Sequence, residues 1–322
     1  GMHGTYYANK SIQESDLLVA IGMRFDDRVT GKISAFAPHA KIIHIDIDPT
    51  SIRKNVRVDV PIVGDVKKVL TTLNKVLKEE VQETWHEVRK SWLKQIADWK
   101  AERPLTYDRE TDIIKPQYVI EKIYELTKGD AIIATEVGQN QMWACQFYKY
   151  DKPRTWLSSG GLGTMGYGLP AAIGAQLAFP NKLVIDIAGD GSIQMNIQEL
   201  ATAVINKLPV KVAILNNGFL GMVRQWQELF FQERYAHTRL DACVDFVKIA
   251  EAYNAVGLRA TKRSEVEPVL KEAFSVKRPV FMDFAIDWQE KVYPMVPAGA
   301  AIDEMLFLEE KKKTEKKLKA VK

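Results

Sequence analysis

Short runs of apolar residues alternate with helical patterns along most of the chain. Six runs rich in β-branched residues have the length of strands, at 17–22, 41–46, 130–135, 183–188, 210–215 and 279–286. Apolar residues recur at helical spacing at 66–79, 116–127, 166–178, 197–208, 246–253 and 264–274. Pro116 at a first turn and the pair Ser264 and Glu267, a predicted capping box, mark two helix starts. Because strands alternate with helices, we expect an α/β fold with a doubly wound parallel sheet.

The same patterning divides the chain into four segments. Residues 1–80 form a small α/β layer, and residues 81–113 are charged, rich in tryptophan and helical in spacing, which predicts a helical linker. Residues 114–300 carry a larger α/β domain, and residues 301–322 form a charged tail. We expect the tryptophans of the linker to be packing anchors rather than a ligand site.

Composition excludes several classes of protein. The chain of 322 residues is 46% hydrophobic and has a formal net charge of +4, so it can bury large cores and is not generally basic. Lysines concentrate in the last residues, where a solvated tail explains them better than nucleic-acid binding does. Cys145 and Cys243 are isolated, which argues against disulfides and zinc and favours a cytoplasmic location. No apolar run has the length of a transmembrane helix, so we expect no membrane contact.

The clearest chemical motif is the segment Gly189-Asp190-Gly191-Ser192, followed by Asn216-Asn217. Asp190 stands 27 residues before Asn217, and the residues between them predict a strand, a helix and a second strand. A right-handed crossover of this size makes the strands parallel, so both polar side chains emerge at one carboxyl edge of the sheet. A carboxylate and an amide oxygen suit Mg²⁺, and the glycines let the backbone approach a diphosphate. A buried capping turn is the alternative for a Gly-Asp-Gly alone, and the asparagine pair at this distance disfavours it.

A second glycine pattern, formed by Gly161, Gly163 and Gly166, fits the GxGxxG signature of dinucleotide-binding proteins. The signature requires a preceding strand, and residues 153–159 are a poor strand. An NAD-dependent oxidoreductase is therefore a weaker hypothesis that the sequence leaves open.

Together these motifs resemble one enzyme family. The Gly-Asp-Gly and Asn-Asn pair looks like the thiamine diphosphate (ThDP) motif. With segments 136–142, 159–170 and 217–226 added, the chain closely resembles the large catalytic subunit of acetolactate (acetohydroxyacid) synthase over essentially its whole length. The resemblance assigns residues 1–80 to the C-terminal part of a Rossmann-like, FAD-binding central domain. It assigns residues 114–300 to the domain that binds the ThDP diphosphate, so only the C-terminal portion of the family's large subunit is matched.

The resemblance implies a cofactor site in the larger domain. Asp190, Asn217 and the Phe219 carbonyl would ligate Mg²⁺. Met165 would be the apolar wedge that keeps ThDP bent, and Asn140 stands where the family typically has a histidine. The residues implied to bind ThDP are Val137, Gly138, Gln139, Asn140, Gly163, Met165, Gly189, Asp190, Gly191, Ser192, Asn217, Phe219, Leu220, Gly221 and Met222.

The resemblance also implies FAD and substrate sites. The residues that fall on the family's FAD contacts are Gly1, Met2, His3, Gly22, Arg24, Asp26, Arg28, Val29, Asp46, Ile47, Gly64, Asp65 and Val66. Substrate contacts would come from Met2, Arg28, Met222 and Trp226. Arg28 offers a bidentate fork to the carboxylate of a keto acid, and Trp226 shares a face with Met222 if that segment is helical. From the residues alone, the charges at 24–28 form a surface ion-pair cluster and Trp226 is a core anchor.

The implied activity belongs to branched-chain amino-acid biosynthesis. Pyruvate would condense with a second 2-keto acid, pyruvate or 2-ketobutyrate, to give acetolactate or acetohydroxybutyrate. This transferase (carboligase) reaction would use ThDP, Mg²⁺ and a structural FAD. Implied partners are further copies of the chain in a homodimer or homotetramer, an N-terminal domain that binds the ThDP pyrimidine, and a small regulatory subunit.

The activating glutamate of the family lies in that N-terminal domain, to which no part of this chain corresponds. We therefore assign no catalytic residue here and expect no activity from the chain alone. The alternatives are another ThDP-dependent 2-keto acid decarboxylase or oxidase, and a non-catalytic cofactor-binding fragment.

Overall fold

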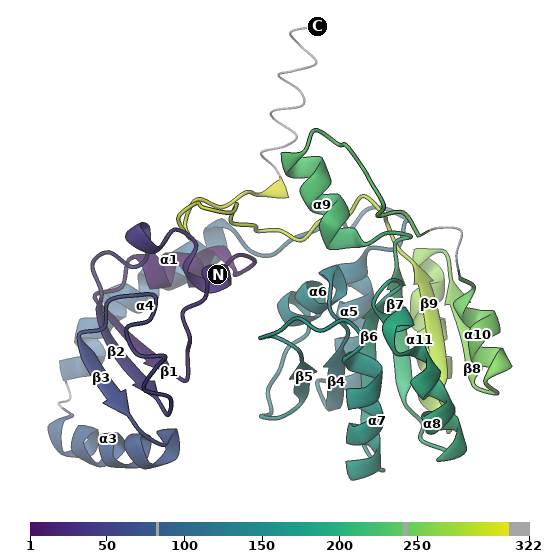
Figure 1. Cartoon of the computed structure of the whole chain (residues 1–322), viewed down its shortest axis with the longest axis horizontal. Helices are drawn as coiled ribbons and strands as arrows, with labels where there is room; N and C mark the ends of the chain where they lie inside the picture. The colour runs from purple at the N-terminus through teal and green to yellow at the C-terminus, as the bar shows by residue number, and fades with distance from the viewer. Residues whose placement is uncertain (82–83, 241–243, 309–322) are drawn as a thin grey trace, which may run out of the picture. The chain divides into compact units, whose positions relative to one another are not determined.

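The computed structural model describes residues 1–81, 84–240 and 244–308 (Figure 1). Within these ranges the chain forms two compact units, which we call the small unit and the large unit. The small unit comprises residues 1–106 and the described residues from 293 onward, and the large unit comprises residues 107–292. The expected linker is thus shared between the units, and the domain boundaries drawn from the sequence remain predictions. Residues 309–322 of the expected tail, and Cys243, lie outside the described residues.

The small unit contains a three-stranded parallel sheet. Its strands are β1 Leu17–Ile21, β2 Lys41–Asp46 and β3 Val60–Val63, in the order β1-β2-β3. Its helices are α1 Tyr6–Gln13, α2 Asp27–Thr30, α3 Val66–Glu80 and α4 Thr84–Glu102. Two of the strands and α3 lie where the apolar pattern predicts them, whereas α1 and β3 were not predicted.

The two faces of the small sheet differ in burial. On one face Ala20 and Ile42 pack with Phe25 and Phe36 in an apolar cluster. The other face carries alternate residues of β1, and Leu17, Val19 and Ile21 are 49%, 47% and 46% exposed. The expected packing role of the tryptophans holds for Trp92 and Trp99, whose rings meet edge to face at 5.7 Å.

The large unit contains a six-stranded sheet in which every pairing is parallel. The strands are β4 Ala131–Thr135, β5 Trp156–Ser158, β6 Leu183–Gly189, β7 Lys211–Asn216, β8 Val256–Ala260 and β9 Val280–Ala285, in the order β5-β4-β6-β7-β9-β8. The helices are α5 Pro116–Thr127, α6 Gln139–Phe147, α7 Gly168–Ala178, α8 Leu200–Ile205, α9 Gly221–Phe230, α10 Phe246–Ala252 and α11 Arg263–Ser275.

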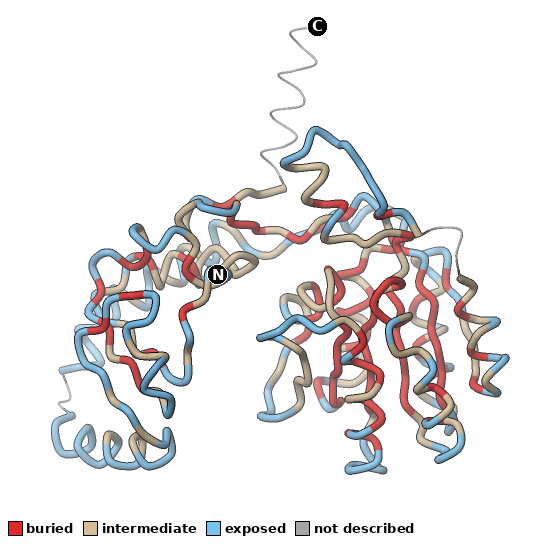
Figure 2. The backbone as a smooth tube through the Cα atoms, viewed as in Figure 1, coloured by how far each residue is buried: buried red, intermediate tan, exposed pale blue. Residues whose placement is uncertain are grey.

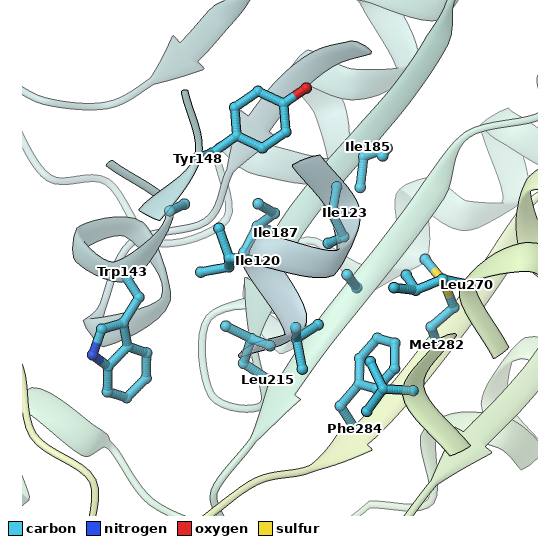
Figure 3. Close-up of a cluster of buried hydrophobic side chains, with 14 of the residues drawn as sticks. Ile120, Ile123, Trp143, Tyr148, Ile185, Ile187, Leu215, Leu270, Met282 and Phe284 are labelled. Atoms are coloured by element: carbon cyan, nitrogen blue, oxygen red, sulfur yellow. The ribbon is translucent and has the colours of Figure 1, made fainter. Parts of the chain in front are cut away.

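Helices cover both faces of this sheet, as the sequence predicts for a doubly wound fold. Side chains of each strand alternate between the faces, so Ile133 of β4 joins a cluster with α5, α6 and α11. Figure 3 shows part of this cluster, including Ile120, Trp143 and Leu270 of the three helices. The neighbours of Ile133 in β4, Ile132 and Ala134, pack on the opposite face with α7, α8 and α10. The four inner strands, β4, β6, β7 and β9, are buried along most of their length, as Figure 2 shows. The edge strands β5 and β8 are mostly half-buried. The sheet therefore lies between two apolar cores.

The strand order places a topological switch at β4. The chain passes from β4 to β5 on one side and then crosses to β6 on the other side of β4. In open parallel sheets, ligands bind beyond the carboxyl ends of the strands at such a point. The segments that follow β4 and β6 are therefore the first place to look for a site.

Several local predictions are wrong. The stretch taken as a poor strand contains the short strand β5, and β8 was also missed. The helix expected at 197–208 begins with a 3₁₀ turn at Ile197–Glu199, and only Leu200–Ile205 is α-helical. Another 3₁₀ turn, Ile193–Met195, precedes it. The α-helix ends at Ile205 because Lys207 has a positive φ of 54°.

The predicted capping box at the start of α11 is also displaced. The helix begins at Arg263, so Ser264 lies inside it, and Glu265 accepts hydrogen bonds from the N–H groups of Thr261 (2.7 Å) and Lys262 (3.1 Å). Among the described residues, no helix combines the length and apolar character needed to cross a membrane.

Candidate cofactor and metal site

The ends of three neighbouring strands enclose a cavity of about 130 Å³ in the large unit. The segments that follow β4, β6 and β7 meet there with the start of α9. The lining residues are Val137, Gly138, Gln139, Asn140, Trp143, Met165, Gly189, Asp190, Gly191, Ser192, Leu215, Asn217, Phe219, Leu220, Gly221, Met222 and Val223. Every residue expected at the ThDP site lines this cavity except Gly163, so the structure brings the dispersed motifs together.

Asp190 lies at the end of β6 and is only 5% exposed. Burial raises the pKa of Asp190 to about 7, although hydrogen bonds from the backbone N–H groups of Gly191 and Gly218 oppose the shift. The bond from Gly218 joins the β6 loop to the β7 loop, as the right-handed crossover predicts. A bound cation would offset the cost of ionising this buried carboxyl group.

Buried amide side chains hold the orientation of Asn217. Its Nδ2 donates to Gln139 Oε1 (3.1 Å), and its Oδ1 accepts from the N–H of Phe219 (3.0 Å). Gln139 Nε2 in turn donates to Gln225 Oε1 (2.9 Å), which also accepts from the N–H of Val292 (2.9 Å). The amide orientation follows from this network, which leaves the Asn217 oxygen on the side of the 217–219 loop.

Gly221, the first residue of α9, is required by the same contacts. A Cβ at this position would lie 2.1 Å from Gln139 Oε1 and 2.7 Å from Asn217 Nδ2. Any side chain there would displace the amides that orient Asn217. The glycine therefore allows α9 to begin directly against the site.

The donor atoms at the cavity suit a hard divalent cation. The Asp190 carboxylate, the Asn217 amide oxygen and the Phe219 carbonyl lie on the adjoining β6 and β7 loops. Among the described residues, no group of three or more His, Cys, Asp or Glu side chains could hold a metal. A site with one carboxylate fits Mg²⁺, which keeps water and phosphate oxygens as its remaining ligands.

The glycines at the cavity allow close approach of a ligand to the backbone. Gly138 has a φ of 151°, and a Cβ on it would lie 2.7 Å from Asn140 Oδ1. Asn140 itself donates through Nδ2 to the carbonyls of Glu136 (3.1 Å) and Ile187 (2.8 Å). Its amide nitrogen thus ties β4 to β6 at the switch point.

Met165 projects from the glycine-rich segment that leads into α7. It lines the cavity, and its Cε lies 4.0 Å from where a Cβ on Gly191 would be. Gly163 has a φ of 67° and lies beside Val137, because a Cβ on it would lie 3.9 Å from Val137 Cγ1. Gly163 therefore shapes the loop without lining the cavity.

Three lining residues were missed from the sequence: Trp143, Leu215 and Val223. Trp143 lies four residues after Gln139 on α6, the spacing at which helical residues share a face. Leu215 is the penultimate residue of β7, and Val223 is in the first turn of α9. Helical spacing would have indicated Trp143 once α6 was predicted.

The substrate residues expected from the resemblance fall in both units. Met222 lines the cavity, and the helix expected to join it to Trp226 is present as α9. Trp226 packs edge to face on Phe230, with ring centroids 5.5 Å apart. In the small unit, the N–H of Met2 donates to the carbonyl of Arg28 (2.7 Å), and both residues line a cavity of about 70 Å³.

Some of the residues expected to bind FAD lie at one edge of the small sheet. Gly22 follows β1, Asp46 ends β2, and Gly64 follows β3, so all three lie at carboxyl ends of parallel strands. Asp65 caps α3 by accepting from the N–H of Lys68 (3.0 Å). The expected ion-pair cluster is also present, since Arg24 contacts Asp26 (2.9 Å).

Two family models match the chain. Residues 136–284 match the C-terminal TPP binding domain of thiamine pyrophosphate enzymes, and residues 1–73 match the central domain of these enzymes.

Individual relatives are similar over nearly the whole chain. It is 49% identical over 315 residues to the acetolactate synthase large subunit of Haemophilus influenzae, covering 98% of this chain and 55% of that protein. It is 48% identical over 309 residues to the acetolactate synthase isozyme 3 large subunit of Escherichia coli, covering 95% and 54%. Identity to the chloroplastic acetolactate synthase 1 of Oryza sativa is 50% over 314 residues, covering 95% and 49%. The chain spans about half the length of these curated relatives. It belongs to the thiamine pyrophosphate enzymes and is a homologue of acetolactate synthase large subunits.

Proposed function

We propose that this chain is the part of an acetolactate synthase large subunit that holds the diphosphate end of ThDP through Mg²⁺. The complete enzyme would condense pyruvate with a second 2-keto acid to give acetolactate or acetohydroxybutyrate. The observation that carries the proposal is the cavity at the switch point, where one buried carboxylate and an oriented amide lie beside a glycine-lined backbone.

Different residues of the cavity would bind different parts of the cofactor. Asp190, Asn217 and the Phe219 carbonyl would hold Mg²⁺, and the backbone around Gly189 and Gly191 would face the diphosphate. Met165 and Met222 supply apolar surface for the organic part of the cofactor. When bound, ThDP supplies an electron sink for the carbanion that decarboxylation leaves. The contribution of this chain is to fix the position and conformation of the reacting groups.

The small unit would hold FAD and part of the substrate site. The strand ends at Gly22, Asp46 and Gly64 form the kind of edge at which parallel sheets bind nucleotides. FAD would have a structural role, since the condensation involves no net redox change. Arg28 is well exposed and would offer its guanidinium fork to a keto-acid carboxylate, while Met2, Met222 and Trp226 would contact the substrate.

The proposed assembly includes further copies of the chain, an N-terminal domain for the ThDP pyrimidine and a small regulatory subunit. These partners are supported by the similarity to acetolactate synthase large subunits, of which this chain spans about half. A cytoplasmic location is proposed on the same basis.

Calorimetry with ThDP tests the cofactor site directly. Asp190→Asn keeps the shape of the side chain but removes the charged ligand, so ThDP affinity in the presence of Mg²⁺ should fall by at least about tenfold. Asp130→Asn is the control, because Asp130 precedes β4 at the opposite edge of the same sheet and pairs with Lys152 and Lys182. Equal affinities for wild type and Asp190→Asn would refute the metal site.

A further inference from the structure

A buried carboxylate beside the cavity has no part in the proposed site. Glu136 follows β4 directly and is fully buried, although its neighbours Val137 and Gly138 line the cavity. Its Oε2 accepts from the N–H of Gly166 (2.6 Å), and its Oε1 accepts from the N–H of Leu169 (3.1 Å). The N–H of Gly168 is a third donor to this carboxylate. One side chain from β4 therefore gathers the backbone amides at the start of α7.

Glu136 acts as the N-terminal cap of α7 from a different element. The residue at the cap position, Tyr167, makes no capping hydrogen bond with its own side chain. The first amides of a helix have no partner within the helix, and a negative charge there is favoured by the helix dipole. A carboxylate that reaches these amides from β4 fixes the start of α7 against the end of the sheet.

This cap lies next to the residue that shapes the cavity. Met165 lines the cavity and directly precedes Gly166, whose N–H is held by Glu136. The carbonyl of Gly166 is held as well, because it accepts from Asn196 Nδ2 (2.8 Å). Gly166 has a φ of 93°, and a Cβ there would lie 2.7 Å from Asn196 Nδ2. The backbone next to Met165 is therefore held by hydrogen bonds at both the N–H and the carbonyl of Gly166.

Asp186 is a second buried carboxyl group near Glu136, and it affects which of the two is ionised. It is fully buried on β6, and a Cβ on Gly168 would lie only 2.2 Å from its Oδ1. Burial, followed by the charge of Glu136, raises the pKa of Asp186 well above its ordinary value. Burial raises the pKa of Glu136 as well, but hydrogen bonds from the N–H groups of Leu169, Gly166 and Gly168 oppose that shift. These amide donors favour the negative charge of the pair on Glu136.

We infer that Glu136 is a positioning residue, which sets the place of Met165 in the cavity by anchoring the Gly166–Leu169 backbone. The inference deepens the proposed function and rests on it. The Glu136 carboxylate accepts from Gly166, Gly168 and Leu169, none of which is a proposed metal ligand or diphosphate contact. Its effect on binding should therefore be confined to the part of the ligand that Met165 contacts.

The experiment compares two ligands and two matched substitutions by calorimetry in the presence of Mg²⁺. ThDP would contact Met165, whereas inorganic diphosphate lacks the organic rings. Glu136→Gln keeps the shape of the side chain but turns an NH₂ group toward one amide donor. Glu265→Gln makes the same change at the α11 cap, where Glu265 also accepts from backbone amides. We expect Glu136→Gln to weaken ThDP by at least about fivefold and diphosphate by less than about twofold, and Glu265→Gln to leave both unchanged.

A double-mutant cycle distinguishes positioning from a general structural role. Met165→Ala should show the same selective loss of ThDP, and the double variant Glu136→Gln/Met165→Ala should lose little more than either single one. If Glu136→Gln fails to fold, Asn196→Ala removes the other clamp on Gly166 and should give the same selective loss. Amide hydrogen exchange at Gly166 and Leu169 should be faster in Glu136→Gln and unchanged in Met165→Ala.

Each contrary result has a distinct meaning. Equal losses for ThDP and diphosphate, or additive losses in the double variant, would overturn the positioning role. If wild type binds neither ligand, the proposed function is wrong and the inference falls with it. Faster exchange at Gly166 in Glu136→Gln would then show only that Glu136 caps a helix.

Discussion

At the residue scale, the large unit buries ionisable groups whose partners are distant in sequence. Lys211, the first residue of β7, is 1% exposed, and its Nζ donates to the carbonyls of Val276 (2.7 Å) and Arg278 (2.8 Å). Burial lowers the pKa of Lys211 to about 8. The sequence around Lys211 predicts a strand but not a buried ammonium group. The carbonyl groups that accept its hydrogen bonds belong to residues some 65 positions further along the chain.

The Lys211 ammonium group predicts a pH dependence of stability. Its pKa is about 8 in the folded chain and 10.5 in the unfolded chain, so the unfolded chain binds more protons between these values. The stability of wild type relative to Lys211→Met should therefore rise between pH 8 and pH 10, since a neutral amine still donates to both carbonyls. Urea unfolding of both proteins at pH 7.5 and pH 10 measures the difference. A difference that does not change with pH would contradict the burial of the amine.

Some residues of the cofactor site could be predicted from the sequence, and others could not. The Asp190 and Asn217 motif was predictable because one strand–helix–strand unit fixes both residues at one edge. Gln225 was not, because its hydrogen bond to Gln139 joins two helices far apart in sequence. Glu136 begins the segment 136–142 that resembles the family, but its amide partners depend on how the glycine-rich segment folds back over β4.

At the element scale, α9 is turned opposite to the usual arrangement. Arg224 and Gln225 are fully buried, whereas Val223 is 49% exposed and Phe230 is 39% exposed. Arg224 contacts Glu228 (2.8 Å) and donates to the carbonyl of Glu290 (2.8 Å). Helical spacing predicts that a helix forms, but an apolar stripe normally faces the core, so the sequence pattern gives the wrong buried face. Short strands such as β5 are also hard to predict, because three residues are too few to show an alternation of apolar and polar positions.

Because α9 buries Arg224 and exposes Val223, replacing the charged residue should lower stability more than truncating the apolar one. Arg224→Met should lower the free energy of unfolding by about 2 kcal/mol, because it removes one donor from the buried Glu228 carboxylate and one from the Glu290 carbonyl. Lys291 still pairs with Glu228, and Gln139 still donates to the Glu290 carbonyl. Val223→Ala should change it by less than about 0.5 kcal/mol, because Val223 is half exposed. Urea unfolding followed by circular dichroism measures both. A larger loss for Val223→Ala than for Arg224→Met would show that α9 packs through its apolar side.

At the scale of the whole molecule, the two units differ in how much core they possess. The sheet of the large unit has an apolar cluster on each face. The described part of the small unit has one such cluster, and the second face of its sheet exposes Leu17, Val19 and Ile21. The alternating strands and helices predicted both parallel sheets, but the division near residue 107 follows from tertiary contacts that the sequence does not display.

Because the two units differ in the size of their apolar cores, we predict that they unfold independently. Calorimetry of the whole chain should show two transitions, the first from the small unit, because it buries fewer apolar side chains. A protein comprising residues 107–292 should fold alone and show only the second transition, at an unchanged temperature. A single transition in the whole chain, or failure of residues 107–292 to fold, would contradict this division.

Position 221 has a consequence for how homologous chains diverge. The three atoms nearest to a Cβ there are all side-chain atoms of Gln139 and Asn217. A substitution would thus be structurally admissible only in a lineage that has altered Gln139 or Asn217, the groups that orient the metal ligand. Among descendants and duplicates of this gene, loss of Gly221 should mark copies that have abandoned the cofactor while keeping the fold.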